Sequence, residues 1–304
     1  MVKEQQKKYL ISFILISYNR IEVLLECIAS IKGQTYSDIE IVLVDNASSD
    51  GTAATIRRSH PDIRLICSEV NLGVPGARNL AIRHASGEIF AFIDDDCLIR
   101  DTEFASKLNL FFSKRDEVSI LTFKIINYFT NKINRHEFPH RNKKLSDHEF
   151  ETSYFLGGAN AIRRQVFESI GEFYSDYFYG FEELDFSFRA MEHDFRMFYS
   201  PRFEVFHKTS ADARPSWRSV YFFTRNRIWF AFSFLPWYFI VSQLIIWFSF
   251  FFFTAVKIRH PMTFFQGIKD GLRGLPKIYS RRKNLKISKT LMKKIFNLKG
   301  RLLY

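Results

Sequence analysis

The stretch EIFAFIDDDC at residues 88–97 places three acids directly after a short apolar run. A helix predicted over residues 75–86 ends at Gly87, and the apolar run that follows it predicts a β-strand leading into the acids. In open parallel sheets, ligands bind beyond the carboxyl ends of the strands. The acids Asp94, Asp95 and Asp96 are therefore predicted to lie at a ligand-binding edge.

Strand-like runs upstream of this stretch also end in polar residues. Residues 10–17 (LISFILIS) and 40–45 (EIVLVD) flank a helical stripe at residues 21–33, and residues 63–67 (IRLIC) add a third run. Strand, helix and strand in this order form a βαβ unit, which predicts an α/β fold with a mostly parallel sheet and flanking helices. The polar residues at the strand ends are Ser17, Tyr18, Asp45 and Asn46.

Predicted helices and strands continue downstream of the acids, except in one long irregular segment. Residues 128–150 are polar and irregular, and we expect them to form a loop over the site. No internal repeat is present. The other predicted elements are helices at 102–114, 163–170 and 182–193, and strands at 118–127, 195–199 and 203–207.

The C-terminal part differs from the rest in hydropathy and charge. Residues 228–256 contain no charged residue, although one bilayer span needs only about twenty apolar residues. One tilted helix fits this length, and Pro236 also allows a break into a short hairpin. Basic residues flank both sides, which favours an element with both ends in the cytosol over a single crossing. We therefore expect a membrane-associated helix or hairpin.

Basic charge is concentrated after this segment. Residues 257–304 carry fourteen Lys or Arg and one Asp, whereas the whole chain has a net charge of +12. The remainder of the chain is therefore close to neutral, and the helical tail is predicted to face an anionic membrane. No nucleic-acid recognition motif accompanies the charge, so a nucleic-acid partner is not expected.

The cysteines and the N-terminus give no sign of an extracellular protein. Cys27, Cys67 and Cys97 are far apart and show no metal-ligand spacing, so neither disulfides nor a zinc site is predicted. The opening residues MVKEQQKKYL are not followed by a long apolar run, and no signal peptide is predicted. We expect the body of the protein to face the cytosol.

Asp94 and Asp96 have the spacing of ligands for a hard cation. As alternate residues at a strand end, both carboxylates can approach one ion directly or through water. Mg²⁺ and Mn²⁺ prefer carboxylate and phosphate oxygens, and a cation bridging a diphosphate acts as a Lewis acid on the leaving group. We therefore predict a divalent metal, Mg²⁺ or Mn²⁺, as cofactor.

Five motifs in order resemble those of glycosyltransferase family 2, which has the GT-A fold of nucleotide-diphospho-sugar transferases. The resemblance extends over about residues 10–210, two thirds of the chain. It implies a catalytic domain at 1–215, with a nucleotide-binding half at about 1–100 and an acceptor half at about 101–215, followed by the membrane-associated part at 216–304. The motifs are ISYNR (16–20), VDNASSDGT (44–52), NLGVPGARNLAIRHASGEIFAFIDDDC (71–97), GGANAIRR (157–164) and FYGFEELDFSFRA (178–190).

The resemblance also implies roles for particular residues. Many relatives have a second Asp where this chain has Asn46, so the contact to the base differs here. The metal ligands implied are Asp94, Asp96 and His207. The substrate-binding residues implied are Ser17, Tyr18, Asp45, Asn46, Arg78, Asp94, Asp95, Gly157, Gly158 and Glu182.

The acidic segment FEELD resembles the family motif whose second acid is the general base. Glu183 occupies that position, with Glu where Asp is commoner, and its place at a helix start suits a carboxylate that accepts a proton. Asp185 is the second candidate for a catalytic role. Asp185 and Arg189 are also spaced as an i, i+4 ion pair, which is the structural alternative for that acid.

The resemblance implies an inverting glycosyltransferase, moving a hexose or deoxyhexose from a nucleotide-diphospho-sugar to a glycan acceptor. The apolar segment suggests an acceptor at the cytoplasmic face of the cell membrane, such as a polyprenyl-linked glycan in surface polysaccharide synthesis. A sugar nucleotidyltransferase is one alternative, but it needs a Gly-rich, Arg-containing loop where this chain has SYNR. An inactive membrane-bound nucleotide-sugar-binding protein is another, but the acids are all present.

Overall fold

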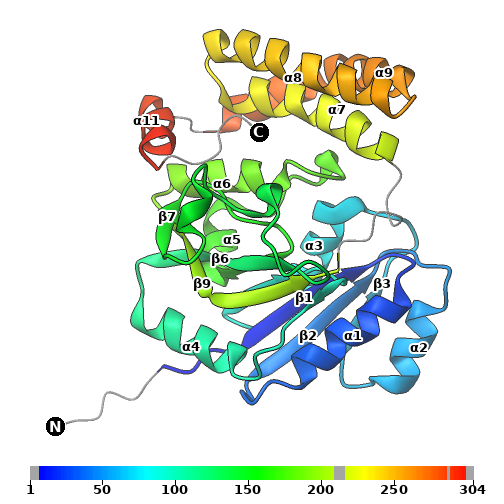
Figure 1. The fold of residues 1–304 in the computed structure, drawn as a ribbon, viewed down its shortest axis with the longest axis vertical. Helices are drawn as coiled ribbons and strands as arrows, with labels where there is room; N and C mark the ends of the chain where they lie inside the picture. Colours follow the sequence, from blue (N-terminus) through cyan, green and yellow to red (C-terminus); the bar gives the residue numbers. More distant parts are fainter. Residues whose placement is uncertain (1–6, 209–215, 286–287, 299–304) are drawn as a thin grey trace.

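A nine-stranded mixed sheet forms the centre of the molecule in the computed structural model, which describes residues 7–208, 216–285 and 288–298. Its strand order is β3-β2-β1-β4-β8-β6-β9-β5, with β7 paired to β9. The first four strands in this order are parallel (Figure 1). These strands are β1 (Ile11–Ser17), β2 (Ile39–Asp45), β3 (Arg64–Cys67) and β4 (Ile89–Ile93). The predicted α/β fold with a Rossmann-like parallel half is confirmed.

The second half of the sheet is mixed because β8 runs antiparallel to both β4 and β6. The two strands predicted at 195–199 and 203–207 are one strand, β9, whose pairing with β6 shifts register after Phe123. The reversal at β8 brings Gly158 to the end of β4, where the Asp94 N–H donates to the Gly158 carbonyl at 3.0 Å. The strands are β5 (Cys97–Leu98), β6 (Val118–Asn127), β7 (Phe150–Thr152), β8 (Ala159–Arg163) and β9 (Arg196–His207).

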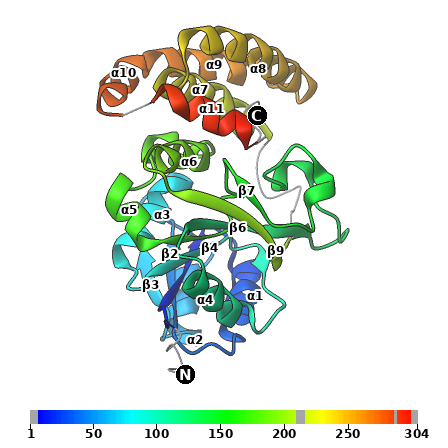
Figure 2. The same cartoon turned by 90° about the vertical axis from the view of Figure 1, so that its left-hand side faces the viewer.

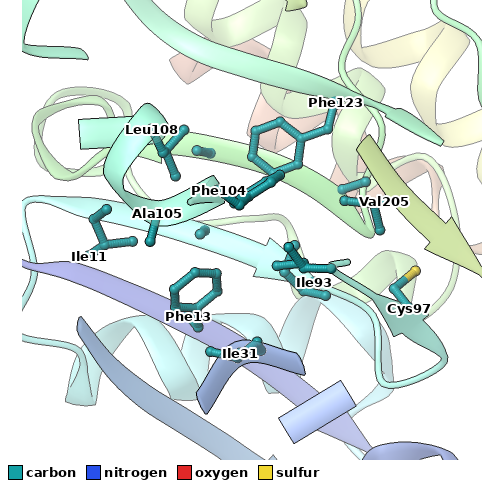
Figure 3. Close-up of a cluster of buried hydrophobic side chains, with 14 of the residues drawn as sticks. Ile11, Phe13, Ile31, Ile93, Cys97, Phe104, Ala105, Leu108, Phe123 and Val205 are labelled. Atoms are coloured by element: carbon teal, nitrogen blue, oxygen red, sulfur yellow. The ribbon is translucent and has the colours of Figure 1, made fainter. Parts of the chain in front are cut away.

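Helices cover both faces of the sheet, so the central strands are apolar on both sides. On one face, α1 and α4 bury Ile31 and Phe104 against Phe13 and Phe123 (Figure 3). On the other, α3, α5 and α6 pack over Ile14 and neighbouring residues. Helix α2 was not predicted. The helices are α1 (Ile21–Lys32), α2 (Thr52–Ser59), α3 (Gly73–His84), α4 (Phe104–Lys114), α5 (Arg164–Ile170) and α6 (Glu182–Glu192).

Four C-terminal helices lie together beyond α6, and we call α7–α10 the helical cap (Figures 1 and 2). The uncharged stretch 228–256 is divided between α7 and α8, because Pro236 separates them. Only α8, among the described residues, is long and apolar enough to cross a membrane, with a mean hydropathy of 2.1. The helices are α7 (Ser216–Phe234), α8 (Trp237–Lys257), α9 (Pro261–Arg273), α10 (Leu275–Asn284) and, beside α6, α11 (Lys289–Asn297).

Candidate active site

A cleft of 680 Å³ lies between the ends of the sheet strands, the start of α6 and the helical cap. It brings together residues that are more than a hundred positions apart in the sequence. The polar strand end after β4 contributes to it, as does the acidic start of α6. Of the residues predicted for the site, the cleft is lined by Arg78, Asp94, Gly157, Gly158, Glu182, Glu183 and His207.

Arg78 on α3 joins the acids of the cleft. Its guanidinium donates to Asp94 at 3.4 Å, to Glu183 at 3.1 Å and to Glu182 at 3.4 Å. Burial by itself lowers the pKa of Arg78, but the negative charges of Glu183 and Asp94 outweigh burial and raise it. Arg78 is therefore positively charged, and its guanidinium contacts both the acid after β4 and the two acids at the start of α6.

A turn with unusual backbone angles positions the two glutamates. Phe178, Gly180 and Phe181 have φ angles of 61°, 75° and 79°, in the left-handed region that non-glycine residues rarely adopt. The two phenylalanines cost about 1–3 kcal/mol each in this region, whereas glycine adopts it freely, and such residues persist where the surrounding structure determines them. The turn ends at the start of α6, so both glutamates leave the helix at its first turn, facing Arg78.

Glu182 is the more buried of the two acids. Burial, followed by the adjacent Glu183 carboxylate, raises the pKa of Glu182 to about 8, and a hydrogen bond between the two carboxyl groups favours the protonated form. Glu183 keeps part of its surface open to the cleft, with a side-chain exposure of 14% against 2% for Glu182. Glu183 is therefore the acid that a bound substrate can reach.

Gly157 and Gly158 lie where side chains would displace the acids. A Cβ atom at residue 157 would overlap the Glu183 carboxylate, and one at residue 158 would overlap the Asp94 carboxylate. Glycine is required here because the backbone passes within contact distance of both acids.

Asp95 and Asp96 point to a different environment from Asp94. Arg20 donates to Asp95 at 3.0 Å and to Asp96 at 2.8 Å. Burial and the Asp96 charge raise the pKa of Asp95 to about 7. Asp96 and Arg20 line a second cavity of 370 Å³ next to α1, whereas Asp94 lines the main cleft. Asp94 and Asp96 therefore line two different cavities, and Asp95 lines neither of them.

The donor set best placed for a cation is formed by Asp96 and His207. The His207 Nε2 lies 3.3 Å from Asp96 Oδ1, and Glu137 contacts the other ring nitrogen at 2.5 Å. Burial by itself lowers the pKa of His207, but hydrogen bonds to Asp96 and Glu137 outweigh it and raise the pKa to about 10. A divalent cation would displace the Nε2 proton, and the carboxylate and the imidazole held by a second carboxylate would then suit it.

Cys97 and Asp94 complete the surroundings of this donor pair. Ligand atoms of Asp96, Cys97 and His207 lie within 4.8 Å of one another. Burial raises the pKa of the Cys97 thiol well above its usual value, so the thiol is a poor ligand for a hard cation. Asp94 is not a member of this group, and its carboxylate contacts Arg78. The residues present fit Mg²⁺ or Mn²⁺ through Asp96 and His207.

The residues predicted for the nucleotide lie at the ends of β1 and β2. Ser17 is buried, and its hydroxyl has no hydrogen-bond partner among the described residues, whereas Tyr18 is 44% exposed. Asp45 accepts from the Ser48 N–H at 3.0 Å. Asn46 accepts from the Leu72 N–H at 2.8 Å and so supports the turn before α3. These residues do not line the main cleft.

Asp185 does not face the cleft. Its carboxylate is fully buried and contacts Arg189 at 2.9 Å, Arg281 at 2.6 Å and the Tyr177 hydroxyl at 3.2 Å. Glu182 and Asp185 lie one helical turn apart, but Asp185 is not among the residues that line the cleft, and its carboxylate contacts Arg281 of α10 instead. These contacts support the structural alternative, an i, i+4 ion pair between Asp185 and Arg189. Arg281 of the helical cap pairs with the same carboxylate.

Several residues of the site were not predicted from the sequence. Arg20 belongs to the ISYNR motif, but the motif alone does not indicate that it pairs with two of the acids. Glu137 and His136 come from the irregular loop 128–150, which carries no local pattern that would identify them. The predicted position of that loop over the site agrees with the cleft lining, since both residues border the cleft.

Comparisons with known proteins agree with this architecture. A model of the family described as Glycosyl transferase family 2 matches residues 12–171, just over half of the chain. The chain belongs to this family, and its class of enzyme is glycosyltransferase.

Curated relatives and a solved structure extend the comparison. An uncharacterised protein of Haemophilus influenzae is 33% identical over 173 residues, covering 55% of this chain and 94% of that protein. The Escherichia coli UDP-Glc:alpha-D-GlcNAc-diphosphoundecaprenol beta-1,3-glucosyltransferase WfgD is 36% identical over 124 residues, covering 39% of this chain and 47% of WfgD. The match thus spans about half of the length of that glucosyltransferase.

The fold alone is shared with the mannosyltransferase PcManGT of Pyrobaculum calidifontis, solved in complex with GDP-Man and Mn²⁺. The two structures have a TM-score of 0.57 at 17% identity, over 96% of this chain and 84% of PcManGT. The predicted GT-A fold class is confirmed by this likeness together with the sheet described above.

Proposed function

We propose that the protein is an inverting, metal-dependent glycosyltransferase that acts on a lipid-linked glycan at the cytoplasmic face of the membrane. The observation that carries this proposal is the Arg78 cluster, in which one guanidinium contacts Asp94 at the strand end and Glu183 at the helix start. Direct displacement needs a base that takes the proton of the acceptor hydroxyl close to the donor sugar. A contact that holds Glu183 beside the acid at the strand end supports this role.

The proposed chemistry is a single displacement. The Glu183 carboxylate takes the proton of the acceptor hydroxyl, and the hydroxyl oxygen attacks the anomeric carbon of the donor sugar. The bond between that carbon and the diphosphate oxygen breaks, and the nucleoside diphosphate leaves. Attack from the face opposite the leaving group inverts the anomeric configuration. Asp94 and Arg78 line the same cleft as Glu183.

Asp96 and His207 are the residues that would hold the cation. A bound Mg²⁺ or Mn²⁺ supplies Lewis-acid stabilisation of the departing diphosphate. Ser17, Tyr18, Asp45 and Asn46 would contact the base and ribose, at the strand ends beside the second cavity. Support for a metal comes from the donor set itself and from the Mn²⁺ in PcManGT, whose fold is shared.

The lipid-linked acceptor is supported by the relatives and by the apolar cap. WfgD is named for an acceptor carried on diphosphoundecaprenol. Helix α8 exposes Ile245, Ile246 and Phe253 along one face, with exposed fractions of 64%, 55% and 70%. Such a face suits contact with the interfacial region of a bilayer. Because α8 packs on α7 and α9, we place it along the membrane surface.

Glu183→Gln is the decisive variant for the proposed mechanism. The amide keeps the shape of the side chain but cannot accept the proton, so we expect transfer to fall by about 10²- to 10⁴-fold. Transfer is measured as release of nucleoside diphosphate by the full chain, in a screen of UDP-, GDP- and dTDP-sugars with Mn²⁺ and a polyprenyl-diphosphate-linked N-acetylglucosamine acceptor.

Binding of the nucleotide should survive this substitution, with a thermal shift within error of the wild type. Glu183→Asp, which retains a carboxylate, serves as the matched control and should keep part of the activity. Wild-type turnover by Glu183→Gln would remove Glu183 from the role of base. Activity that is unchanged by EDTA would exclude the proposed cation.

A further inference from the structure

Arg227 on α7 is a buried arginine for which the described residues provide neither a hydrogen-bond acceptor at Nε nor a carboxylate. Arg227 is 2% exposed, and among the described residues its Nε–H has no hydrogen-bond acceptor and its guanidinium has no carboxylate partner. The guanidinium lies between the rings of Phe181 and Trp247, 4.8 and 4.3 Å from their centroids. Burial lowers the pKa of Arg227 to about 9, and no neighbouring charge opposes this effect.

Other buried arginines in the described chain are compensated. Arg78 contacts three carboxylates, Arg189 contacts Asp185, and Arg163 donates to the carbonyl oxygens of Val118 and Phe112. A buried charge is costly unless it is paired and hydrogen-bonded. The two aromatic rings offset only part of that cost. The described residues therefore leave Arg227 without the compensation that the other buried arginines have.

A second unsatisfied donor lies at the same place. The indole Nε1–H of Trp247 on α8 is buried and has no acceptor among the described residues. Trp247 and Arg227 both line the main cleft, on the side formed by the helical cap. Both side chains line the same cleft and carry N–H groups that the described residues leave without an acceptor, and such donors match an oxyanion such as a phosphate.

The surroundings of these donors indicate what carries the phosphate. Phe223, Phe250 and Phe251 line this side of the cleft, and Phe250 is 55% exposed. The cleft thus runs from the acids of the sheet edge, past Arg227, to the apolar surface of the cap. A ligand that fills it has a sugar at Glu183, an anionic group at Arg227 and an apolar chain along α8.

We propose that Arg227 and Trp247 bind the phosphate group of a lipid-linked acceptor, with the lipid chain following the apolar side of the cap. This inference rests on the proposed function, since it assigns the acceptor to the cap side of Glu183. The donor diphosphate is assigned to the opposite side, near Asp96 and His207.

The test compares binding of three probes to the full chain in detergent, by isothermal titration calorimetry. Farnesyl diphosphate carries both features of the proposed ligand, farnesol lacks the phosphates, and inorganic pyrophosphate lacks the chain. We expect the wild type to bind farnesyl diphosphate more tightly than either of the others. Arg227→Met should weaken farnesyl diphosphate binding by about tenfold or more, because it removes a charge-assisted contact. Arg227→Lys should give an intermediate loss.

Two controls make the result specific. Arg227→Met should leave UDP binding with Mn²⁺ unchanged, and its Tm should equal or exceed that of the wild type, because an unpaired buried charge is removed. Arg225→Met, two residues away, removes hydrogen bonds to the carbonyl oxygens of Asp176 and Tyr177. This second variant should lower the Tm and leave farnesyl diphosphate binding unchanged.

Three results would overturn the proposal. Equal binding of farnesyl diphosphate by wild type and Arg227→Met would remove Arg227 from the site. Pyrophosphate binding as tight as that of farnesyl diphosphate would exclude recognition of a lipid. Loss of UDP binding in Arg227→Met would assign the arginine to the donor. Failure of the proposed function shows separately, as the absence of nucleotide-sugar turnover by the wild type.

Discussion

Gly157 controls the position of the proposed base. Because a Cβ at this residue would overlap the Glu183 carboxylate, Gly157→Ala must displace that acid. A shift of about 1 Å in a reacting group can cost about 10²-fold in rate, so we expect kcat to fall by that order. Gly33→Ala is the matched control, since a Cβ at residue 33 makes only ordinary contacts with helix carbonyl oxygens. Equal activity of Gly157→Ala and wild type would show that Glu183 is not held there.

Asp185 is predicted to act on stability and not on catalysis. Asp185→Asn leaves Arg189 and Arg281 without their buried carboxylate, and breaking such a pair costs about 3–5 kcal/mol. We expect a lower free energy of unfolding in urea, with kcat retained at temperatures where the variant is folded. A loss of kcat without a loss of stability would restore a catalytic role for Asp185.

The same pair predicts a pH dependence of stability. Burial by itself raises the pKa of Asp185, but Arg281 and then Arg189 outweigh it and lower the pKa below its usual value of about 3.8. A lowered folded-state pKa gives stability that is present above the unfolded pKa and lost as pH falls through the folded one. The difference between wild type and Asp185→Asn should therefore be constant from neutral pH to about pH 5 and shrink below pH 4.

Helix α8 has an outer face that the rest of the described chain does not cover. Ile246→Glu with Phe253→Glu places two charges on this face, where both side chains are more than half exposed. We expect the double variant to move from the membrane pellet to the supernatant after fractionation, while UDP binding is retained. Leu110→Glu, an exposed leucine on α4, is the control and should leave fractionation unchanged. A wild-type chain found wholly in the supernatant would contradict membrane contact.

The helical cap and the catalytic body share one core. Phe230 and Phe234 of α7 belong to the same buried cluster as Phe92 of β4, and Phe234 meets Phe188 of α6 with ring centroids 5.3 Å apart. Phe234→Ala should therefore destabilise the whole chain by about 3–5 kcal/mol, the range for a buried phenylalanine. Thermal unfolding should remain a single transition. Phe253→Ala, 70% exposed on α8, should change stability by less than about 0.5 kcal/mol. Two separate transitions would show that cap and body are independent.

Much of the fold and part of the site follow from local sequence patterns. The apolar runs at β1, β2 and β4 predict a parallel half-sheet, because period and length are properties of the strand itself. Polar residues at the ends of those strands must then meet at one edge, which places the acids after β4. The break at Pro236 is equally local, since proline cannot continue the helix by donating a backbone hydrogen bond.

Only the tertiary structure decides which of these residues act on one another. Arg78 reaches Glu183, 105 positions away, because α3 and α6 pack on the same face of the sheet. Asp185 contacts Arg281 because that side chain reaches it from α10, which packs on α7, and no spacing in the sequence indicates this contact. In the sequence, Arg227 is an ordinary basic residue beside an apolar segment. Only the packing of α7 and α8 shows that it is buried without a carboxylate from the described residues. Periodicity is set within a segment, whereas partners and burial are set by the packing of segments that are distant in the chain.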